Sequence, residues 1–334
     1  MLLISVFTKL LHLLPGELSH YLALNGLKLL YSTGILRIMM HSPDLKENSK
    51  NRDLRHLSKK LGIAAGLDKN GDYIDCLSVL GIDFIEVGTV TPRPQKGNPK
   101  PRIFRDKKEK SLLNRLGFNN KGVDHLVKNL KSRESNIIVG SSVGKNFDTP
   151  NESAFEDYIH CIEKVYEYSD YIAVNISSPN TKDLRALSNE EHFSFLLHKI
   201  KNLQNILSIK YGYIPIFIKI SPDEDKHNLK IICSSILENK LDGIICSNTT
   251  IDHHSKDGLG GLSGAPLKKK ANDCLKEVRS LVGSKIPIIA SGGVMSVADY
   301  LEKIDAGADH VQIYTGFIFE GPKLIKDIIQ HSSN

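Results

Sequence analysis

The sequence predicts an α/β protein, a (β/α)8 barrel preceded by an amphipathic helical extension at its amino terminus. Three observations lead to this prediction. Short runs rich in Ile and Val recur eight times after residue 60, a helical stretch separates each run from the next, and polar residues and glycines gather where the runs end. Strands that are apolar on both faces and alternate with helices form parallel sheets, and eight such units close into a barrel. An open, doubly wound sheet is the alternative.

The amino-terminal segment predicts two helices. Apolar residues at Leu3, Val6, Phe7, Leu10, Leu11 and Leu14 follow the spacing of an amphipathic helix over residues 1–14. Pro15-Gly16 breaks this helix, and a second stretch runs from about Glu17 to Met40. Such a pair either packs on the protein body or lies on a membrane surface, and the pattern favours neither. We therefore expect a helical segment over 1–42, a polar linker over 43–60 and the barrel over 61–334.

The barrel elements follow in order along the chain. The predicted strands are 61–66, 82–88, 137–143, 170–176, 214–220, 242–247, 286–291 and 309–314. The predicted helices lie near 70–80, 119–132, 151–168, 188–211, 223–239, 266–282, 296–306 and 321–331. Each helix follows one strand, as the barrel fold requires.

The carboxyl ends of the predicted strands carry the functional signal. Polar residues and glycines there would meet at the active-site face of a barrel. Turns from strand to helix also favour Gly, Asn and Ser, but this does not explain Lys69 and Lys219, since lysine has no turn preference. Ser291-Gly292-Gly293 follows the seventh strand and Tyr314-Thr315-Gly316 the eighth. Free backbone N–H groups at these two ends predict a phosphate site.

Composition excludes several classes of protein. The chain has 334 residues, of which 40% are hydrophobic and 25% charged, and this is ordinary globular composition. A net charge of +6 without a block of like charges argues against nucleic-acid binding. The five cysteines have no CxxC pair and the histidines no HExxH motif, so we expect neither disulfides nor a bound metal.

Seven motifs in order make the chain resemble the dihydroorotate dehydrogenases. They are AGLDKNG, EVGTVTPRPQKGNPKPR, NRLGFNN, NISSPNT, SNTT, GGLSG and VQIYTGFIFEGP, spread over about residues 60–325. The amino-terminal helix pair resembles the class 2, quinone-dependent branch. So does Ser178, which stands where the soluble class 1 enzymes carry cysteine.

The resemblance implies oxidation of (S)-dihydroorotate to orotate in pyrimidine biosynthesis. A base takes a proton from C5, hydride passes from C6 to N5 of one non-covalently bound FMN, and the electrons leave to ubiquinone or menaquinone. The residues implied in cofactor binding are Ala65, Gly66, Leu67, Asp68, Lys69, Thr89, Ser142, Asn175, Lys219, Ser247, Gly264, Gly293, Tyr314 and Thr315. Those implied in substrate binding are Lys69, Asn114, Arg115, Leu116, Gly117, Phe118, Asn175, Asn180, Asn248 and Thr249.

The resemblance also implies two catalytic residues. Ser178 is the expected base, and because NISSPN holds no histidine or carboxylate, a proton relay through water is expected to assist it. Lys219 is expected beside the flavin ring, where it stabilises the negative charge of reduction. The alternative for Lys219 is a barrel-core lysine paired with a carboxylate. For Ser177 we expect a loop hydrogen bond.

The chain departs from the family pattern at three places. Ser142 stands where an asparagine is usual, Ser247 replaces a threonine, and the loop from Ile251 to Leu259 is short. The competing functions are a class 1-like flavin barrel that uses fumarate or NAD, and an inactive barrel scaffold. The class 2 interpretation implies a monomer bound peripherally, through its amino-terminal helices, to the cytoplasmic side of a bacterial inner membrane.

Overall fold

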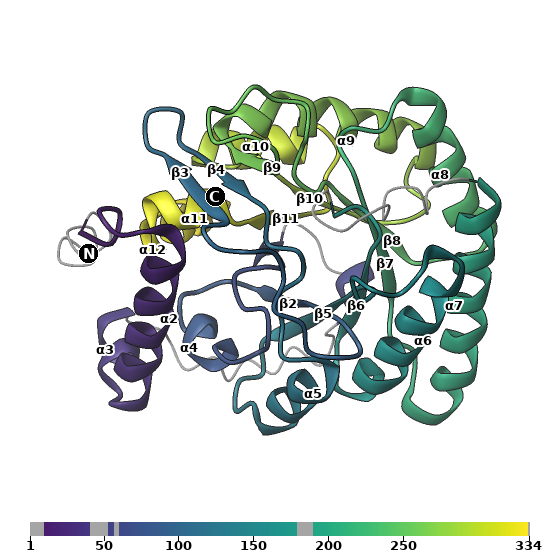
Figure 1. The fold of residues 1–334 in the computed structure, drawn as a ribbon, viewed down its shortest axis with the longest axis horizontal. Coiled ribbons are helices and arrows are strands. Elements are labelled where there is room, and N and C mark those ends of the chain that lie inside the picture. The colour runs from purple at the N-terminus through teal and green to yellow at the C-terminus, as the bar shows by residue number, and fades with distance from the viewer. Residues whose placement is uncertain (1–9, 41–52, 57–59, 179–189, 333–334) are drawn as a thin grey trace.

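Eight parallel strands form a closed barrel in the computed structural model of the chain (Figure 1). The structure describes residues 10–40, 53–56, 60–178 and 190–332. Strands that follow one another in the barrel are neighbours, and the last pairs with the first through Leu61 opposite Val311. The barrel prediction is therefore confirmed, and the open doubly wound sheet is excluded.

The barrel strands match the predicted apolar runs to within a few residues. They are β1 (Lys60–Ile63), β2 (Phe84–Val90), β5 (Ile138–Val143), β6 (Tyr171–Asn175), β7 (Ile216–Ile220), β8 (Gly243–Cys246), β10 (Ile288–Ser291) and β11 (His310–Ile313). Almost every strand residue is buried, because side chains on one face fill the barrel and those on the other contact the surrounding helices.

Helices cover the outside of the barrel (Figure 1). They are α4 (Ile74–Ser78), α5 (Val123–Ser132), α6 (Ala154–Val165), α7 (Glu190–Tyr211), α8 (Lys226–Glu238), α9 (Lys268–Val282), α10 (Val297–Asp305), α11 (Thr315–Glu320) and α12 (Pro322–Ser332). Capping side chains begin two of them: Asp225 accepts from the N–H of Asn228, and Ser296 accepts from the N–H of Asp299. The short helix α11 was not predicted, since the sequence there suggested only a turn.

Apolar side chains close the amino-terminal end of the barrel. Leu54, in a short 3₁₀ helix (Leu54–His56), packs with side chains from the strand starts, including Phe84, Tyr171 and Phe217. Its carbonyl oxygen contacts Nε2 of His310 at 2.8 Å. Much of the predicted linker over 43–60 lies outside the described residues, but this part of it seals the barrel floor.

A small antiparallel sheet, which was not predicted, lies at the opposite end. It contains β3 (Ile103–Asp106), β4 (Ser111–Asn114) and β9 (Gly261–Gly264) in the order β3-β4-β9. Each strand has only four residues, and β9 pairs with β4 across about 150 positions of sequence, with Ser111 opposite Gly264. Strands this short carry too little periodicity to be recognised.

The predicted second amino-terminal helix is two helices, α2 (Gly16–Ser32) and α3 (Ile35–Met40). The chain turns between them at Gly34, whose φ of 76° favours glycine. Leu24 and Leu36 face the protein and are buried, whereas Leu22, Leu29 and Ile38 are exposed. Figure 1 shows α2 beside α4 on the outside of the barrel. Most of the predicted first helix lies outside the described residues.

Candidate active site

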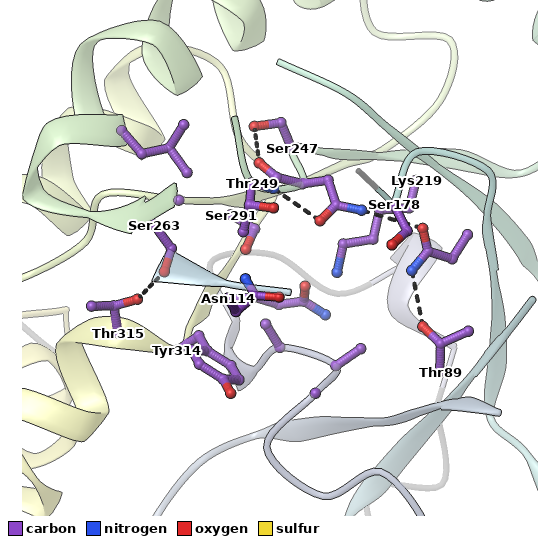
Figure 2. Close-up of a pocket in the computed structure, with 18 of the residues that line it drawn as sticks. Thr89, Asn114, Ser178, Lys219, Ser247, Thr249, Ser263, Ser291, Tyr314 and Thr315 are labelled. Atoms are coloured by element: carbon purple, nitrogen blue, oxygen red, sulfur yellow. Dashed lines mark hydrogen bonds between the residues drawn. The ribbon is translucent and has the colours of Figure 1, made fainter. Parts of the chain in front are cut away.

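A cavity lies at the carboxyl ends of the barrel strands. It encloses about 950 Å³ of empty space, part of which is open to solvent. Its walls come from residues at the ends of β1, β2, β6, β7, β8, β10 and β11 or just after them, together with the small sheet. Figure 2 shows Thr89, Ser178 and Lys219 at one side of it and Ser263, Tyr314 and Thr315 at the other.

Hydrogen bonds between amides and hydroxyls order one side of the cavity. The Asn175 Nδ2 atom donates to Thr89 Oγ1 at 2.9 Å, and Asn248 Nδ2 donates to Asn175 Oδ1 at 3.2 Å. The Ser177 hydroxyl donates to the carbonyl oxygen of Lys219 at 2.8 Å, which is the expected loop hydrogen bond. This network joins β2, β6, β7 and the end of β8, so the amide groups that face the cavity are held in place.

Lys219 lies on β7 at the floor of the same side. Its ammonium nitrogen is 3.2 Å from Oε1 of Glu86 on β2, and both side chains are buried. Lys219 lines the cavity whereas Glu86 does not, so the ammonium group lies between the carboxylate and the cavity. The two interpretations of Lys219 are therefore compatible, because it is a paired core lysine that also faces the site.

Lys69 presents a second ammonium group to the cavity. Among the described residues, no carboxylate lies within ion-pair distance of its Nζ atom. Burial and the positive charge of Arg102, opposed by Glu17, lower the pKa of Lys69 to about 8. It is therefore largely charged at neutral pH and suits an anionic ligand.

Polar residues join the amino-terminal helix α2 to this region. Glu17 accepts from Arg102 in an ion pair of 2.9 Å, and Arg105 donates to the Ser19 hydroxyl at 3.1 Å. Burial and the nearby Lys69 lower the pKa of His20 to about 4, so its imidazole is neutral at physiological pH. The inner face of α2 thus combines apolar contacts with a few partly buried polar groups.

The small sheet and two chain turns form the other side of the cavity. The Thr315 hydroxyl donates to Ser263 Oγ on β9 at 2.8 Å. Gly293 has a φ of 81°, and a side chain there would meet the backbone of Lys268 at 2.3 Å, so the close packing of β10 against α9 requires glycine. Gly293 and Val294 are buried, yet no acceptor among the described residues takes their N–H groups. Buried unpaired donors that line a cavity are suited to an anionic ligand.

Comparison with known proteins settles the family. The model of the dihydroorotate dehydrogenase family matches residues 50–333. This chain belongs to that family. The predicted resemblance is therefore confirmed over nearly the whole barrel.

Curated relatives in the family are named dihydroorotate dehydrogenase (quinone). One from Methylobacillus flagellatus is 43% identical and covers 98% of this chain and 98% of its own. One from Buchnera aphidicola is 47% identical, with 97% of this chain and 98% of its own covered. These matches include the amino-terminal helices, which lie outside the barrel.

Solved structures of the family share the fold. Dihydroorotate dehydrogenase from Eimeria tenella in complex with ferulenol is 32% identical, with a TM-score of 0.81, and covers 94% of this chain and 89% of its own. The ligand-free form from the same organism is 33% identical, with a TM-score of 0.79 and 92% coverage of both chains.

The fold brings together most of the residues that the family resemblance implied. The cavity is lined by Ala65, Gly66, Lys69, Thr89, Asn114, Leu116, Gly117, Phe118, Asn175, Ser178, Lys219, Ser247, Asn248, Thr249, Gly264, Gly293, Tyr314 and Thr315. They come from nine separate segments of the barrel and the small sheet. Asn180 lies outside the described residues.

Four of the implied residues do not line the cavity. Leu67 is buried in the core, and Arg115 points to Asp257, whose carbonyl oxygen it contacts at 2.7 Å. Asp68 accepts the N–H groups of Asp72 and Tyr73, and it therefore shapes the loop that carries Lys69. Burial raises the pKa of this carboxyl to about 6.

Ser142, the fourth, is connected to the cavity only through Thr89. Its hydroxyl is 2.9 Å from Thr89 Oγ1, and Thr89 lines the cavity. A side chain as short as serine stops at this contact, so the expected direct contact with the cofactor is not supported here.

Sequence reasoning missed a group of buried polar residues beneath the cavity. Glu86, Tyr171 and Gln312 contact one another there, and Ser263 in the cavity wall was also not singled out. A carboxylate in the apolar run FIEVGTV was the available signal, because a charge in a buried strand requires a partner.

Proposed function

We propose that the protein oxidises dihydroorotate to orotate and transfers the electrons, through FMN, to a quinone. The supporting observation is that one cavity combines Lys69, Ser178 and Lys219 with a cluster of asparagine amides. The relatives named as quinone-linked dihydroorotate dehydrogenases support the same reaction.

The residues of the cavity fit one non-covalently bound FMN. The unpaired N–H groups of Gly293 and Val294, with the Thr315 hydroxyl nearby, suit its phosphate. Thr89, Asn175 and Lys219 would contact the ring at the other side. When bound, the flavin accepts the hydride and passes electrons on, which no side chain does alone.

Lys69 and the amide cluster are suited to the substrate. Dihydroorotate is an anionic cyclic imide, so its carboxylate requires a cation and its ring edge requires paired donors and acceptors. Lys69 supplies the positive charge, and Asn114, Asn175 and Asn248 supply the amides.

Ser178 is the proposed base. It is buried, lines the cavity and follows β6 in the same segment as Asn175. Among the described residues that line the cavity there is no histidine or carboxylate, so a Ser-His-Asp arrangement has no members there. We therefore expect the proton to leave Ser178 through water.

The helices α2 and α3 would deliver the quinone, either ubiquinone or menaquinone. Their outer face exposes Leu18, Tyr21, Leu22, Leu29 and Ile38. On their inner face, Glu17 and His20 lie near Lys69, which lines the cavity. The amino-terminal segment has a net positive charge, from Lys9, Lys28 and Arg37 against Glu17. This charge favours binding to an anionic membrane surface.

A peripheral attachment agrees with this arrangement. Within the described residues, the structure holds no helix with the length and apolar character of a membrane span. We propose a monomer on the cytoplasmic face of a bacterial inner membrane, attached by an apolar helical surface and released in part by salt.

Three measurements test the proposed function. The purified protein should be yellow, and denaturation should release a flavin that carries one phosphate. Anaerobic dihydroorotate should bleach it, and a quinone should restore the colour faster than fumarate or NAD. Release of FAD, or absence of flavin after reconstitution, would refute the cofactor assignment, whereas a preference for fumarate or NAD would refute the quinone.

A further inference from the structure

Glu86 is a buried carboxylate that the proposed reaction does not use. It lies in the middle of β2 and has no exposed surface, although the strand is otherwise apolar or neutral. Burial of a charge in a barrel interior costs several kcal/mol unless the charge is paired and hydrogen-bonded. The burial of the Glu86 carboxylate therefore requires partners that compensate its charge.

Three side chains from three other strands contact this carboxylate. Lys219 on β7 donates to Oε1 at 3.2 Å. Gln312 on β11 donates to Oε2 at 2.8 Å, and the Tyr171 hydroxyl on β6 donates to the same oxygen at 3.2 Å. Both oxygens are satisfied, and the one ammonium among the three donors also lines the cavity.

The orientation of Gln312 shows that the carboxylate organises this group. The Nε2 atom of Gln312 serves both Glu86 and Tyr171, while its Oε1 atom is buried with no hydrogen-bond partner in the described part of the chain. The amide therefore leaves its own acceptor unpaired in order to donate to Glu86.

Two other lysines show what happens to a buried ammonium that has no such partner. Lys303 is fully buried, its Nζ atom has no hydrogen-bond partner among the described residues, and burial lowers its pKa to about 8. The pKa of Lys69, which has no ion-pair partner among the described residues, is also lowered to about 8. Lys219 is nearly as deeply buried as Lys303 and more deeply buried than Lys69, but it has Glu86.

We propose that Glu86 is a positioning residue that keeps Lys219 charged and holds its ammonium group against the flavin. This inference rests on the proposed function, which assigns Lys219 to the flavin. The titratable groups around the ammonium are Glu86 from β2 and Tyr171 from β6, with Lys69 and Tyr314 elsewhere in the cavity wall. Burial holds the pKa of both tyrosines above the neutral range, so neither changes charge there.

The test compares the pH dependence of the FMN midpoint potential between variants. All proteins in this comparison carry Lys69→Arg, which removes the cavity ammonium that titrates near pH 8 in the wild type. In Glu86→Gln, the buried Lys219 ammonium loses its counter-charge and should release its proton at a lower pH than in the protein that keeps Glu86. In the Lys69→Arg background, the plot of potential against pH should therefore gain a break with Glu86→Gln that it lacks with Glu86. Above the break, the flavin becomes harder to reduce, and reduction by dihydroorotate slows about tenfold for each pH unit.

Two control variants separate charge from shape. Tyr171→Phe removes one hydrogen bond to Glu86 but keeps its charge, and it should retain the plot of the protein that keeps both residues. Glu86→Gln combined with Lys219→Arg should also lack the break, because a guanidinium stays charged throughout this range. A merely structural role for Glu86 would not produce this pattern.

The outcomes are distinct. A flavin-bound Glu86→Gln protein with the same plot as the protein that keeps Glu86 would overturn the inference, as would a break that persists when Lys219→Arg is added. If Glu86→Gln does not fold, Glu86→Asp replaces it. The carboxylate of Asp is withdrawn from Lys219 by one methylene group, so a break at higher pH than in Glu86→Gln is expected, and its absence overturns the inference. A wild-type protein that binds no flavin would instead refute the proposed function.

Discussion

Lys69 should make substrate affinity depend on pH near 8. Burial and Arg102 lower the pKa of this ammonium group to about 8, so about nine tenths of it is charged at pH 7 and about one tenth at pH 9. The charged form exists below the pKa and is lost as pH rises through it. Because the ligand carboxylate binds the charged form, affinity should fall about tenfold between pH 7 and 9, which is about 1.4 kcal/mol.

Two other described groups near the cavity have pKa values far from this range. The pKa of His20 is lowered to about 4, and burial raises the pKa of Tyr314 to about 12. Lys303 has a pKa of about 8, but it lies on α10 and does not line the cavity. A change in affinity centred near pH 8 is therefore assigned to Lys69.

The assay is a titration of orotate into the oxidised flavoprotein, followed by flavin absorbance between pH 6.5 and 9. Lys69→Arg is the matched control, because arginine stays charged and should give a flat profile, with some loss of affinity from its different shape. An affinity of the wild type that does not change from pH 7 to 9 would contradict the reasoning. So would a profile of Lys69→Arg that falls in parallel with the wild type.

Three further predictions concern the base, the cofactor and the membrane surface. Ser178→Ala should slow flavin reduction by dihydroorotate about 10²–10⁴-fold in single-turnover measurements, with a much smaller change in orotate affinity; an unchanged rate would remove Ser178 as the base. Ser142→Asn should leave FMN affinity unchanged or raise it about fivefold, a gain in binding free energy near 1 kcal/mol, since a longer side chain reaches past Thr89. A marked loss of FMN would show that the pocket is adapted to serine. Leu29→Glu should weaken binding to anionic vesicles and slow turnover with a long-chain quinone, while FMN reduction is spared, because this side chain is 65% exposed on α2. The control is Ile209→Glu on α7, where the side chain is 89% exposed, and equal effects of the two changes would refute the assignment of the surface.

The barrel was predictable because its signal is local. Each strand is a short, mostly apolar run that needs no distant partner to be recognised, as in Tyr171 to Val174, and most of the intervening helices carry apolar residues at helical spacing. The ends of the strands were equally readable, since parallel strands must bring Lys69, Asn175 and Gly293 to the same face.

The small sheet over the cavity was not predictable in the same way. Its strands have four residues each, and β4 meets β9 only after the barrel has brought Ser111 and Gly264 together. The break at Gly34 was also missed, because a single glycine in an apolar stretch is compatible with a continuous helix.

The sequence by itself therefore determined the barrel, the family and most of the side chains that line the cavity. Only the tertiary structure decided how the charged side chains in and below the cavity wall are paired. Glu86 and Lys219 lie 133 positions apart and meet at 3.2 Å, whereas Lys69 finds no carboxylate among the described residues. These distances cannot be inferred from the spacing along the chain, because they arise from the closure of the sheet. Since pairing and burial set the charge of an ammonium group, only the folded chain distinguishes Lys219, which is paired with a carboxylate, from Lys69, whose pKa is lowered to about 8.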